Sequence, residues 1–230
     1  MMLQPVAKNM ETEKVKHRYD RIAPLYDILE FPMENMVSAR LRRELLSGIG
    51  GKILEVGIGT GKNLPYYPKN AMLTGIDISP GMLAHTRRKA SELKIEIALS
   101  IMDTEKLAFS EGCFDFVVST FVFCSVADPV RGLREIKRVL KTNGTALFLE
   151  HVRSENLFFG KLMDAVNPFV RKIIGPNINR RTVENIKNAG FTPVQIKSTK
   201  ADIIKQIWAK PTSVYTGKQQ RFRHESRKGT

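Results

Sequence analysis

A glycine-rich loop carries the clearest chemical signal in the sequence. It reads Glu55-Val56-Gly57-Ile58-Gly59-Thr60-Gly61 and directly follows an apolar stretch. Glycines at these positions let the backbone turn tightly and approach a ligand closely. A dinucleotide fingerprint needs glycine where Lys62 stands, and a phosphate-binding P-loop needs glycine where Val56 stands. The spacing therefore argues against both phosphate-binding loops.

Three acidic residues accompany the loop, each expected at the end of a strand. Glu55 would repel a pyrophosphate but suits the ammonium and sulfonium charges of S-adenosylmethionine. Asp77 follows Glu55 by 22 residues and can accept hydrogen bonds from ribose hydroxyls, with a helix-capping role as the alternative. Asp103 can accept a hydrogen bond from an adenine amino group while Met102 packs against the ring, with an ordinary loop position as the alternative. Their order along the chain predicts a site for S-adenosylmethionine.

Strands and helices alternate along the chain and must position these residues. Helices are expected to begin at Ser79-Pro80 and at Asp128-Pro129, where a capping residue precedes proline, and the second is expected to end at Asn143-Gly144. Such alternation predicts a doubly wound, Rossmann-like α/β fold with a mostly parallel sheet and helices on both faces. The expected strands are Ile53–Ile58, Met72–Ile78, Ile95–Ile101, Phe114–Thr120 and Thr145–Val152, followed by Phe191–Ser198 and Ile203–Lys210 as an antiparallel edge.

The length of 230 residues favours one domain with appendages. We expect residues 1–47 to form a helical segment that is part of the acceptor site or of its lid, with a loose arm or frayed helix over 1–16 and an amphipathic helix over 33–46. Residues 48–211 would form the cofactor-binding domain, with an acceptor-side insertion over 153–190. The basic stretch 212–230 is expected to be a flexible tail.

At this point the sequence resembles the class I methyltransferases, from about Tyr19 to about Lys210. Gly57, Gly59, Gly61, Asp77 and Asp103 match the positions that bind S-adenosylmethionine in that family. The resemblance implies the same cofactor, Ile78 beside Asp77 as part of its site, and a seven-stranded sheet whose seventh strand is antiparallel.

The segment Tyr19-Asp20-Arg21-Ile22-Ala23-Pro24-Leu25-Tyr26-Asp27 is similar to one in soluble bacterial phosphatidylethanolamine N-methyltransferases and in related quinone and thiol methyltransferases. Phe123–Val126, Leu149–Val152 and Asn179–Thr182 also resemble that group. The segment and the basic surface favour the phospholipid enzyme, which methylates phosphatidylethanolamine toward phosphatidylcholine. Quinone C-methylation and thiol S-methylation remain open as alternatives.

Several side chains are candidates for the acceptor site. We expect Tyr19, Tyr26 and His151 to line it, with His151 as the base that deprotonates an amine. The alternative for His151 is a histidine hydrogen-bonded at a strand end. Arg180 and Arg181 are candidates for binding a lipid phosphate, and a solvated helix start is the alternative for both.

The net charge of +14 favours an anionic partner, and residues 197–230 contribute half of it, with nine basic and two acidic residues. Residues 157–174 mix apolar and basic side chains in a way that suits either an interfacial helix or a lid over the active site. No apolar run reaches the roughly 20 residues of a membrane-spanning helix. We therefore expect a cytoplasmic protein that associates peripherally with an anionic membrane.

Two rival functions use the same features. A nucleic-acid methyltransferase would also exploit the positive charge, but the sequence has no Asn/Asp-Pro-Pro-Tyr motif, and Phe222 is the only aromatic residue over 218–228. A protein that binds the cofactor without catalysis is the other rival. Cys113 and Cys124 have neither the spacing nor the neighbouring histidine of a metal site. We expect no nucleic-acid partner and no metal, and the sequence leaves the oligomeric state open.

Overall fold

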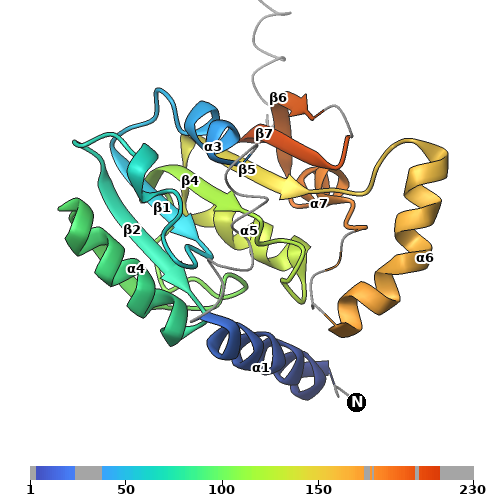
Figure 1. Cartoon of the computed structure of the whole chain (residues 1–230). Helices are drawn as coiled ribbons and strands as arrows, with labels where there is room; N and C mark the ends of the chain where they lie inside the picture. Colours follow the sequence, from blue (N-terminus) through green and yellow to red (C-terminus); the bar gives the residue numbers. More distant parts are fainter. Residues whose placement is uncertain (1–3, 24–37, 174–176, 178, 200–201, 213–230) are drawn as a thin grey trace, which may run out of the picture.

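The computed structural model describes residues 4–23, 38–173, 177, 179–199 and 202–212. Within this part of the chain, seven strands form one sheet in the order β3-β2-β1-β4-β5-β7-β6 (Figure 1). The pairs among β1 to β5 are parallel, and β7 runs antiparallel to both β5 and β6. This confirms the doubly wound, mostly parallel sheet with an antiparallel edge. The strands are β1 (Lys52–Val56), β2 (Met72–Asp77), β3 (Ile97–Ile101), β4 (Phe114–Thr120), β5 (Leu140–His151), β6 (Phe191–Ser198) and β7 (Ile204–Pro211).

Two of the helices begin where their capping residues predict. Ser79 accepts a hydrogen bond at Oγ from the Met82 amide at 3.1 Å, and Asp128 accepts one at Oδ1 from the Arg131 amide at 3.1 Å. Proline follows each cap, which fixes the first helical turn. The helical elements are α1 (Gln4–Ile22), α3 (Ala39–Leu45), η3 (Leu64–Tyr66), α4 (Pro80–Leu93), α5 (Pro129–Val139), α6 (Leu157–Ile173) and α7 (Thr182–Asn188).

The core lies on both faces of the sheet. Leu54 of β1 belongs to a buried cluster that includes Ile136 of α5 and Ile186 of α7. Its neighbour Ile53 points to the other face and belongs to a second cluster that includes residues of α3 and α4. Burial on both faces explains why the central strands are continuous apolar runs.

Several strand ends differ by one or two residues from the sequence prediction, and the two boundaries near Asn143-Gly144 differ by more. The helix expected to run to Asn143-Gly144 ends at Val139, and β5 begins at once at Leu140. The register of β5 against β4 shifts between Phe114 and Phe116, so the chain passes Asn143-Gly144 inside an irregular strand. A Cβ at Gly144 would lie 2.8 Å from the Asp115 carbonyl oxygen, which explains the glycine without a helix end.

Of the two alternatives for residues 1–16, a loose arm or a helix, the structure shows a helix: α1 runs from Gln4 to Ile22 and lies across the carboxyl edge of the sheet (Figure 1). The described part of the second predicted helix is α3. Most of the predicted tail, residues 213–230, lies outside the described residues. The domain limits expected from the sequence stay a prediction. Among the described helices, none is long and apolar enough to cross a bilayer.

Candidate active site

A cavity lies at the carboxyl edge of the parallel strands, where folds of this class bind their ligands. It measures about 940 Å³ including its open mouth, within the usual range of small-molecule sites. Its walls come from α1, α3 and the loops that follow β1, β2, β3 and β4. The predicted cofactor residues that line it are Gly57, Gly59, Asp77, Ile78, Met102 and Asp103.

The glycine loop has the backbone that only glycine adopts easily. Gly57, Gly59 and Gly61 have φ angles of +63°, +57° and +76°. A Cβ at Gly57 would lie 2.5 Å from a methyl carbon of Val122, and one at Gly61 would lie 2.9 Å from a methyl carbon of Leu64. Gly59 has no atom within 4 Å of its Cβ position, so it leaves open space toward the cavity. Gly61 itself does not line the cavity, and its contribution is the shape of the loop.

Asp77 joins this loop to the end of β2. Its Oδ2 accepts a hydrogen bond from the Gly59 amide at 2.9 Å, and its Oδ1 accepts one from the Ser79 amide at 2.9 Å. Burial raises the pKa of Asp77, and these two amides oppose that rise. A carboxylate has acceptor capacity beyond two hydrogen bonds. Asp77 can therefore hold the loop and still accept hydrogen bonds from a ligand in the cavity that it lines.

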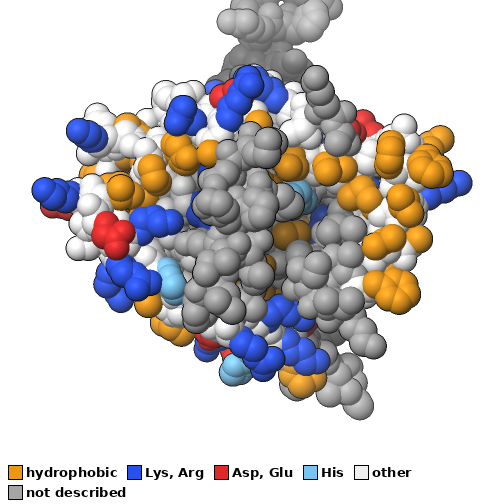
Figure 2. Space-filling view, viewed as in Figure 1, with side chains coloured by type: hydrophobic (Ala, Val, Ile, Leu, Met, Phe, Trp, Pro, Cys, Tyr) orange, Lys and Arg blue, Asp and Glu red, His pale blue; other side chains and the backbone are white. Residues whose placement is uncertain are grey.

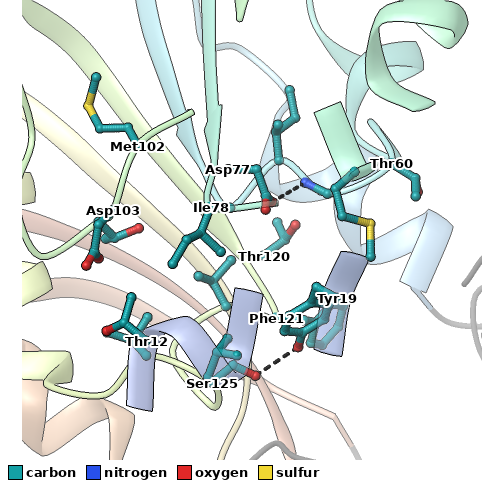
Figure 3. A pocket seen from close by; sticks show the side chains of 18 of the residues that line it. Thr12, Tyr19, Thr60, Asp77, Ile78, Met102, Asp103, Thr120, Phe121 and Ser125 are labelled. Atoms are coloured by element: carbon teal, nitrogen blue, oxygen red, sulfur yellow. Dashed lines mark hydrogen bonds between the residues drawn. The ribbon is translucent and has the colours of Figure 1, made fainter. Parts of the chain in front are cut away.

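Asp103 lies toward the opposite end of the cavity from the glycine loop. Figure 3 shows Asp77 between Asp103 and Thr60. Asp103 Oδ1 accepts a hydrogen bond from the Glu105 amide at 2.9 Å, and the Met102 sulfur accepts one from the Ala108 amide at 3.3 Å. The adenine, ribose and amino-acid parts of one extended ligand would lie at Asp103, at Asp77 and at the glycine loop, in that order. The residues present therefore fit S-adenosylmethionine.

Glu55 lies outside the cavity lining. Its Oε1 accepts a hydrogen bond from Asn63 Nδ2 at 2.7 Å, and its Oε2 accepts one from the Tyr67 hydroxyl at 2.8 Å. Complete burial raises the pKa of Glu55 to about 7. The carboxyl thus supports the segment behind the glycine loop, and its contact with the cofactor stays a prediction.

Arg42 is a lining residue that the sequence pattern did not reveal. The helical spacing placed it among the polar positions, yet it is only 4% exposed. It donates hydrogen bonds to Asn63 Oδ1 at 2.8 Å and to Thr120 Oγ1 at 2.7 Å, and its guanidinium carbon lies 5.4 Å from the Phe121 ring centroid. No sequence signal distinguishes this arginine from the exposed Arg40 on the same helix.

Helix α1 forms one wall of the cavity, partly through Thr12 and Val15, which sequence analysis did not single out. Thr12, Val15 and Tyr19 line the cavity from this helix. The Tyr19 hydroxyl lies 2.9 Å from Ser125 Oγ, as Figure 3 shows. The next residue, Asp20, accepts hydrogen bonds at Oδ1 from Ser79 Oγ and from the Gly81 amide. The helix is thereby bonded to the start of α4 and to the loop after β4.

A buried carboxyl shapes the loop after β4. Glu150 accepts hydrogen bonds from Ser119 Oγ at 2.9 Å and from the Val122 and Phe123 amides at 3.2 Å each. Burial raises the pKa of Glu150 to about 7. Phe121 lies inside this loop with a φ of +58° and lines the cavity. Glu150 therefore fixes an unusual backbone conformation next to the site, a role that its position in the sequence did not indicate.

The other predicted acceptor residues are not gathered at the cavity. The His151 ring packs against Phe121 with centroids 4.6 Å apart, but His151 is not a lining residue. Arg180 donates from Nη2 to the Val126 carbonyl at 2.8 Å. Arg181 is exposed beside Glu184 at 3.4 Å. Tyr26 lies outside the described residues, so of this group the structure places Tyr19 in the cavity.

Comparisons with known proteins relate the chain to methyltransferases. A family model described as "Methyltransferase domain" matches residues 54–148. The chain is 35% identical over 146 residues to a phosphatidylethanolamine N-methyltransferase of Cereibacter sphaeroides, covering 62% of this chain and 70% of that protein. It is 30% identical over 179 residues to the human thiol S-methyltransferase TMT1B, covering 72% and 73% of the two chains. Quinone C-methyltransferases are also among the matching proteins.

A similar fold occurs in a crystal structure of an S-adenosylmethionine-dependent methyltransferase from Thermotoga maritima, described as a possible histamine N-methyltransferase. The TM-score is 0.65 at 18% identity, and the match covers 85% of this chain and 99% of the other. At that identity the likeness supports the fold, and the family rests on the closer sequence matches.

Proposed function

Since the chain belongs to the S-adenosylmethionine-dependent methyltransferases, we propose that its acceptor is the amino group of phosphatidylethanolamine and of its partly methylated products. The observation that carries this proposal is the position of Tyr19. This tyrosine belongs to the N-terminal segment that resembles the phospholipid enzymes, and it lines the cavity beside the glycine loop. The product of complete methylation would be phosphatidylcholine.

The residues of the chain supply positioning more than reactivity. Bound S-adenosylmethionine supplies an electrophilic methyl group on a sulfonium. The glycine loop, Asp77 and Asp103 would hold its amino-acid, ribose and adenine parts, and Tyr19 lines the same cavity. Holding two reactants in line accounts for a large part of such rate enhancements. The Tyr19 ring and hydroxyl offer an electron-rich surface for an amine that becomes cationic as the bond forms.

His151 remains our proposed base for the amine proton. Its ring packs against Phe121, a residue that lines the cavity. General-base assistance contributes a factor of about 10²–10⁴ in rate. His151→Ala should therefore lower turnover at least about a hundredfold while the affinity for S-adenosylmethionine stays nearly unchanged. A variant with full turnover would remove His151 from this role.

An anionic membrane surface is the partner that the charge favours. The net charge is +14, and each basic residue near such a surface contributes on the order of 1 kcal/mol. We propose that the protein binds it peripherally, with Arg180, Arg181 and the 213–230 tail as candidates for phosphate contacts. Vesicle binding by a chain without residues 213–230 tests the tail, and unchanged binding would exclude it.

Thiol S-methylation is the second candidate, because a thiol methyltransferase matches 72% of the chain. Quinone C-methylation is the third. One experiment separates the three acceptors: the protein is incubated with methyl-labelled S-adenosylmethionine and with separate phospholipid, quinone and thiol pools. We expect label in phosphatidylethanolamine derivatives. Label in a quinone or a thioether, and none in phospholipid, would replace the acceptor and leave the family assignment intact.

A further inference from the structure

Helix α6 turns polar groups toward the protein. Asp164 accepts hydrogen bonds from Arg153 Nη2 at 2.9 Å and from Asn179 Nδ2 at 3.0 Å. Asn167 Nδ2 donates to Asn177 Oδ1 at 3.4 Å. On the same side Gly160 is buried, and a Cβ there would lie 2.6 Å from Arg153 Nη1. The helix is thus attached to the rest of the molecule mainly by polar contacts.

The opposite side of α6 is apolar and open to solvent. Phe158, Leu162, Val166 and Phe169 follow one another at helical spacing and form a stripe. Figure 2 shows apolar side chains gathered over α6, which Figure 1 places at one side of the molecule. The exposed fractions lie between 40% and 77% for the set Leu157, Phe158, Phe159, Leu162, Val166 and Phe169, which we call the α6 apolar face.

This arrangement is the reverse of a usual surface helix, whose apolar stripe faces the core. In the described part of the chain, six of the exposed large apolar side chains belong to the α6 apolar face. Contiguous exposed apolar surface on a folded protein marks an interaction site. A lid role would require these side chains to cover the cavity, yet none of them lines it.

The chain that follows α6 connects the helix to the acceptor side of the cavity. The helix follows β5 directly, and the chain after it returns to the loop beyond β4. There the Asn177 amide donates to the Cys124 carbonyl at 2.9 Å, next to the lining residues Ser125 and Val126. The C-terminal end of α6 is thus linked, through Asn177, to a loop that lines the cavity.

The geometry points to a lipid bilayer as the surface that covers α6, with the helix lying in the interface and its apolar face among the acyl chains. A helix with an apolar stripe, on a chain of +14 net charge, has the charge complementarity that an anionic lipid surface requires. Exposed Lys161 flanks the stripe on the same helix. The acceptor chemistry rests on the proposed function, but docking itself needs no methyl transfer. Apolar insertion adds a salt-resistant component to the electrostatic binding proposed above.

The direct test is binding to phosphatidylcholine vesicles, with and without phosphatidylglycerol, at low and high salt. We expect wild-type protein to bind anionic vesicles and to remain partly bound at high salt. Phe158→Ser with Phe169→Ser should weaken binding by about tenfold for each ring that no longer inserts. The matched control is Met72→Ser with Val194→Ser, which removes side chains that are 58% and 56% exposed elsewhere. It should bind as wild type.

A second measurement does not depend on a loss of binding. Phe169→Trp places a tryptophan on the α6 apolar face, and brominated acyl chains should quench it. The wild-type chain is the control, because its single tryptophan, Trp208, lies on β7. Unquenched fluorescence of the introduced tryptophan in vesicle-bound protein, or equal binding by the double variant and its control, would overturn the proposal. Binding that high salt abolishes completely would overturn it as well.

Two further readouts separate this inference from its rivals. If sedimentation without lipid shows a wild-type dimer that the Phe158→Ser, Phe169→Ser variant loses, a second copy covers α6 and the bilayer proposal fails. Methylation of short-chain phosphatidylethanolamine dissolved as monomers tests the acceptor without a bilayer. No methylation together with salt-resistant insertion would end the proposed function and leave docking intact. Methylation of monomers by a protein that does not insert into vesicles would support the proposed function and end the docking proposal.

Discussion

The cofactor side and the acceptor side of the cavity are built by different means. On the cofactor side, Gly59 lies just after β1, Asp77 ends the adjacent parallel strand β2, and a hydrogen bond at 2.9 Å joins them. On the acceptor side, Tyr19 and Ser125 are 106 residues apart and meet between a helix and a loop. Sheet register places the first pair, whereas packing of separate segments places the second. A motif therefore predicts the cofactor side better than the acceptor side.

The most severe way to break the cofactor side is Gly57→Ala. The added Cβ would lie 2.5 Å from Val122 at a φ of +63°, so the loop must shift. We expect the affinity for S-adenosylmethionine to fall by about a hundredfold or more, because a misplaced loop loses several ligand contacts. Calorimetry measures it. Gly112→Ala is the control, since Gly112 has a φ of +65° with no atom within 4 Å of its Cβ position. An equal loss of S-adenosylmethionine affinity in both variants would mean that backbone strain, and not the clash with Val122, causes the loss.

Asp77→Ala tests the same side through one side chain. Loss of charge-assisted hydrogen bonds to ribose should weaken S-adenosylmethionine binding by roughly tenfold to a hundredfold. Asp115→Ala is the matched control. Asp115 accepts hydrogen bonds from the Lys52 amide and Lys141 Nζ at the other edge of the sheet. Unchanged affinity of the Asp77 variant in calorimetry would remove Asp77 from the site.

Glu150 makes the acceptor-side loop sensitive to pH. Burial raises its pKa from 4.5 to about 7, so the folded state keeps a proton that the unfolded state releases. The contribution of Glu150 to the free energy of unfolding is fully present below about pH 4.5 and is lost as the pH rises to about 7. The loss is on the order of 3 kcal/mol. Glu150→Gln should remove this pH dependence of the stability.

Urea unfolding at pH 5 and pH 8 measures this difference. The stability of wild type relative to Glu150→Gln should fall between the two pH values. Glu184→Gln, at an exposed position on α7, should follow wild type at both. A constant difference between wild type and Glu150→Gln would show that Glu150 is already ionised in the folded protein.

The smallest expected effect is that of Tyr19→Phe, which tests the acceptor side. Tyr19→Phe removes the hydroxyl that lies 2.9 Å from Ser125 Oγ. A hydrogen bond between neutral groups contributes about 0.5–1.5 kcal/mol, so turnover should fall by about twofold to tenfold with cofactor affinity nearly unchanged. Tyr66→Phe, outside the cavity lining, should turn over as wild type. A fall in cofactor affinity without a fall in turnover would place Tyr19 on the cofactor side.

The features that could be predicted from the sequence are those that residues close together in the chain determine. The caps of α4 and α5, the glycine loop and Asp77 could be predicted because turn geometry and strand ends constrain residue type within a few positions. Asn143-Gly144 misled the prediction, because a glycine at an irregular strand position resembles one that ends a helix. Arg42 and Glu150 could not be predicted, since their partners Thr120 and Ser119 lie far along the chain.

The attachment of α1 links ligand exchange to folding. Its bonds join Asp20 to Ser79 across 59 residues and Tyr19 to Ser125 across 106. Closing such long loops costs entropy, so we expect α1 to dock after the sheet and α4 have formed. We therefore expect α1 to open before the sheet does, and its amide hydrogens to exchange faster than those of β1. A cofactor that binds only the docked form shifts this opening equilibrium, so S-adenosylmethionine should slow amide exchange across α1 by the factor 1 + L/Kd, where L is the free cofactor concentration.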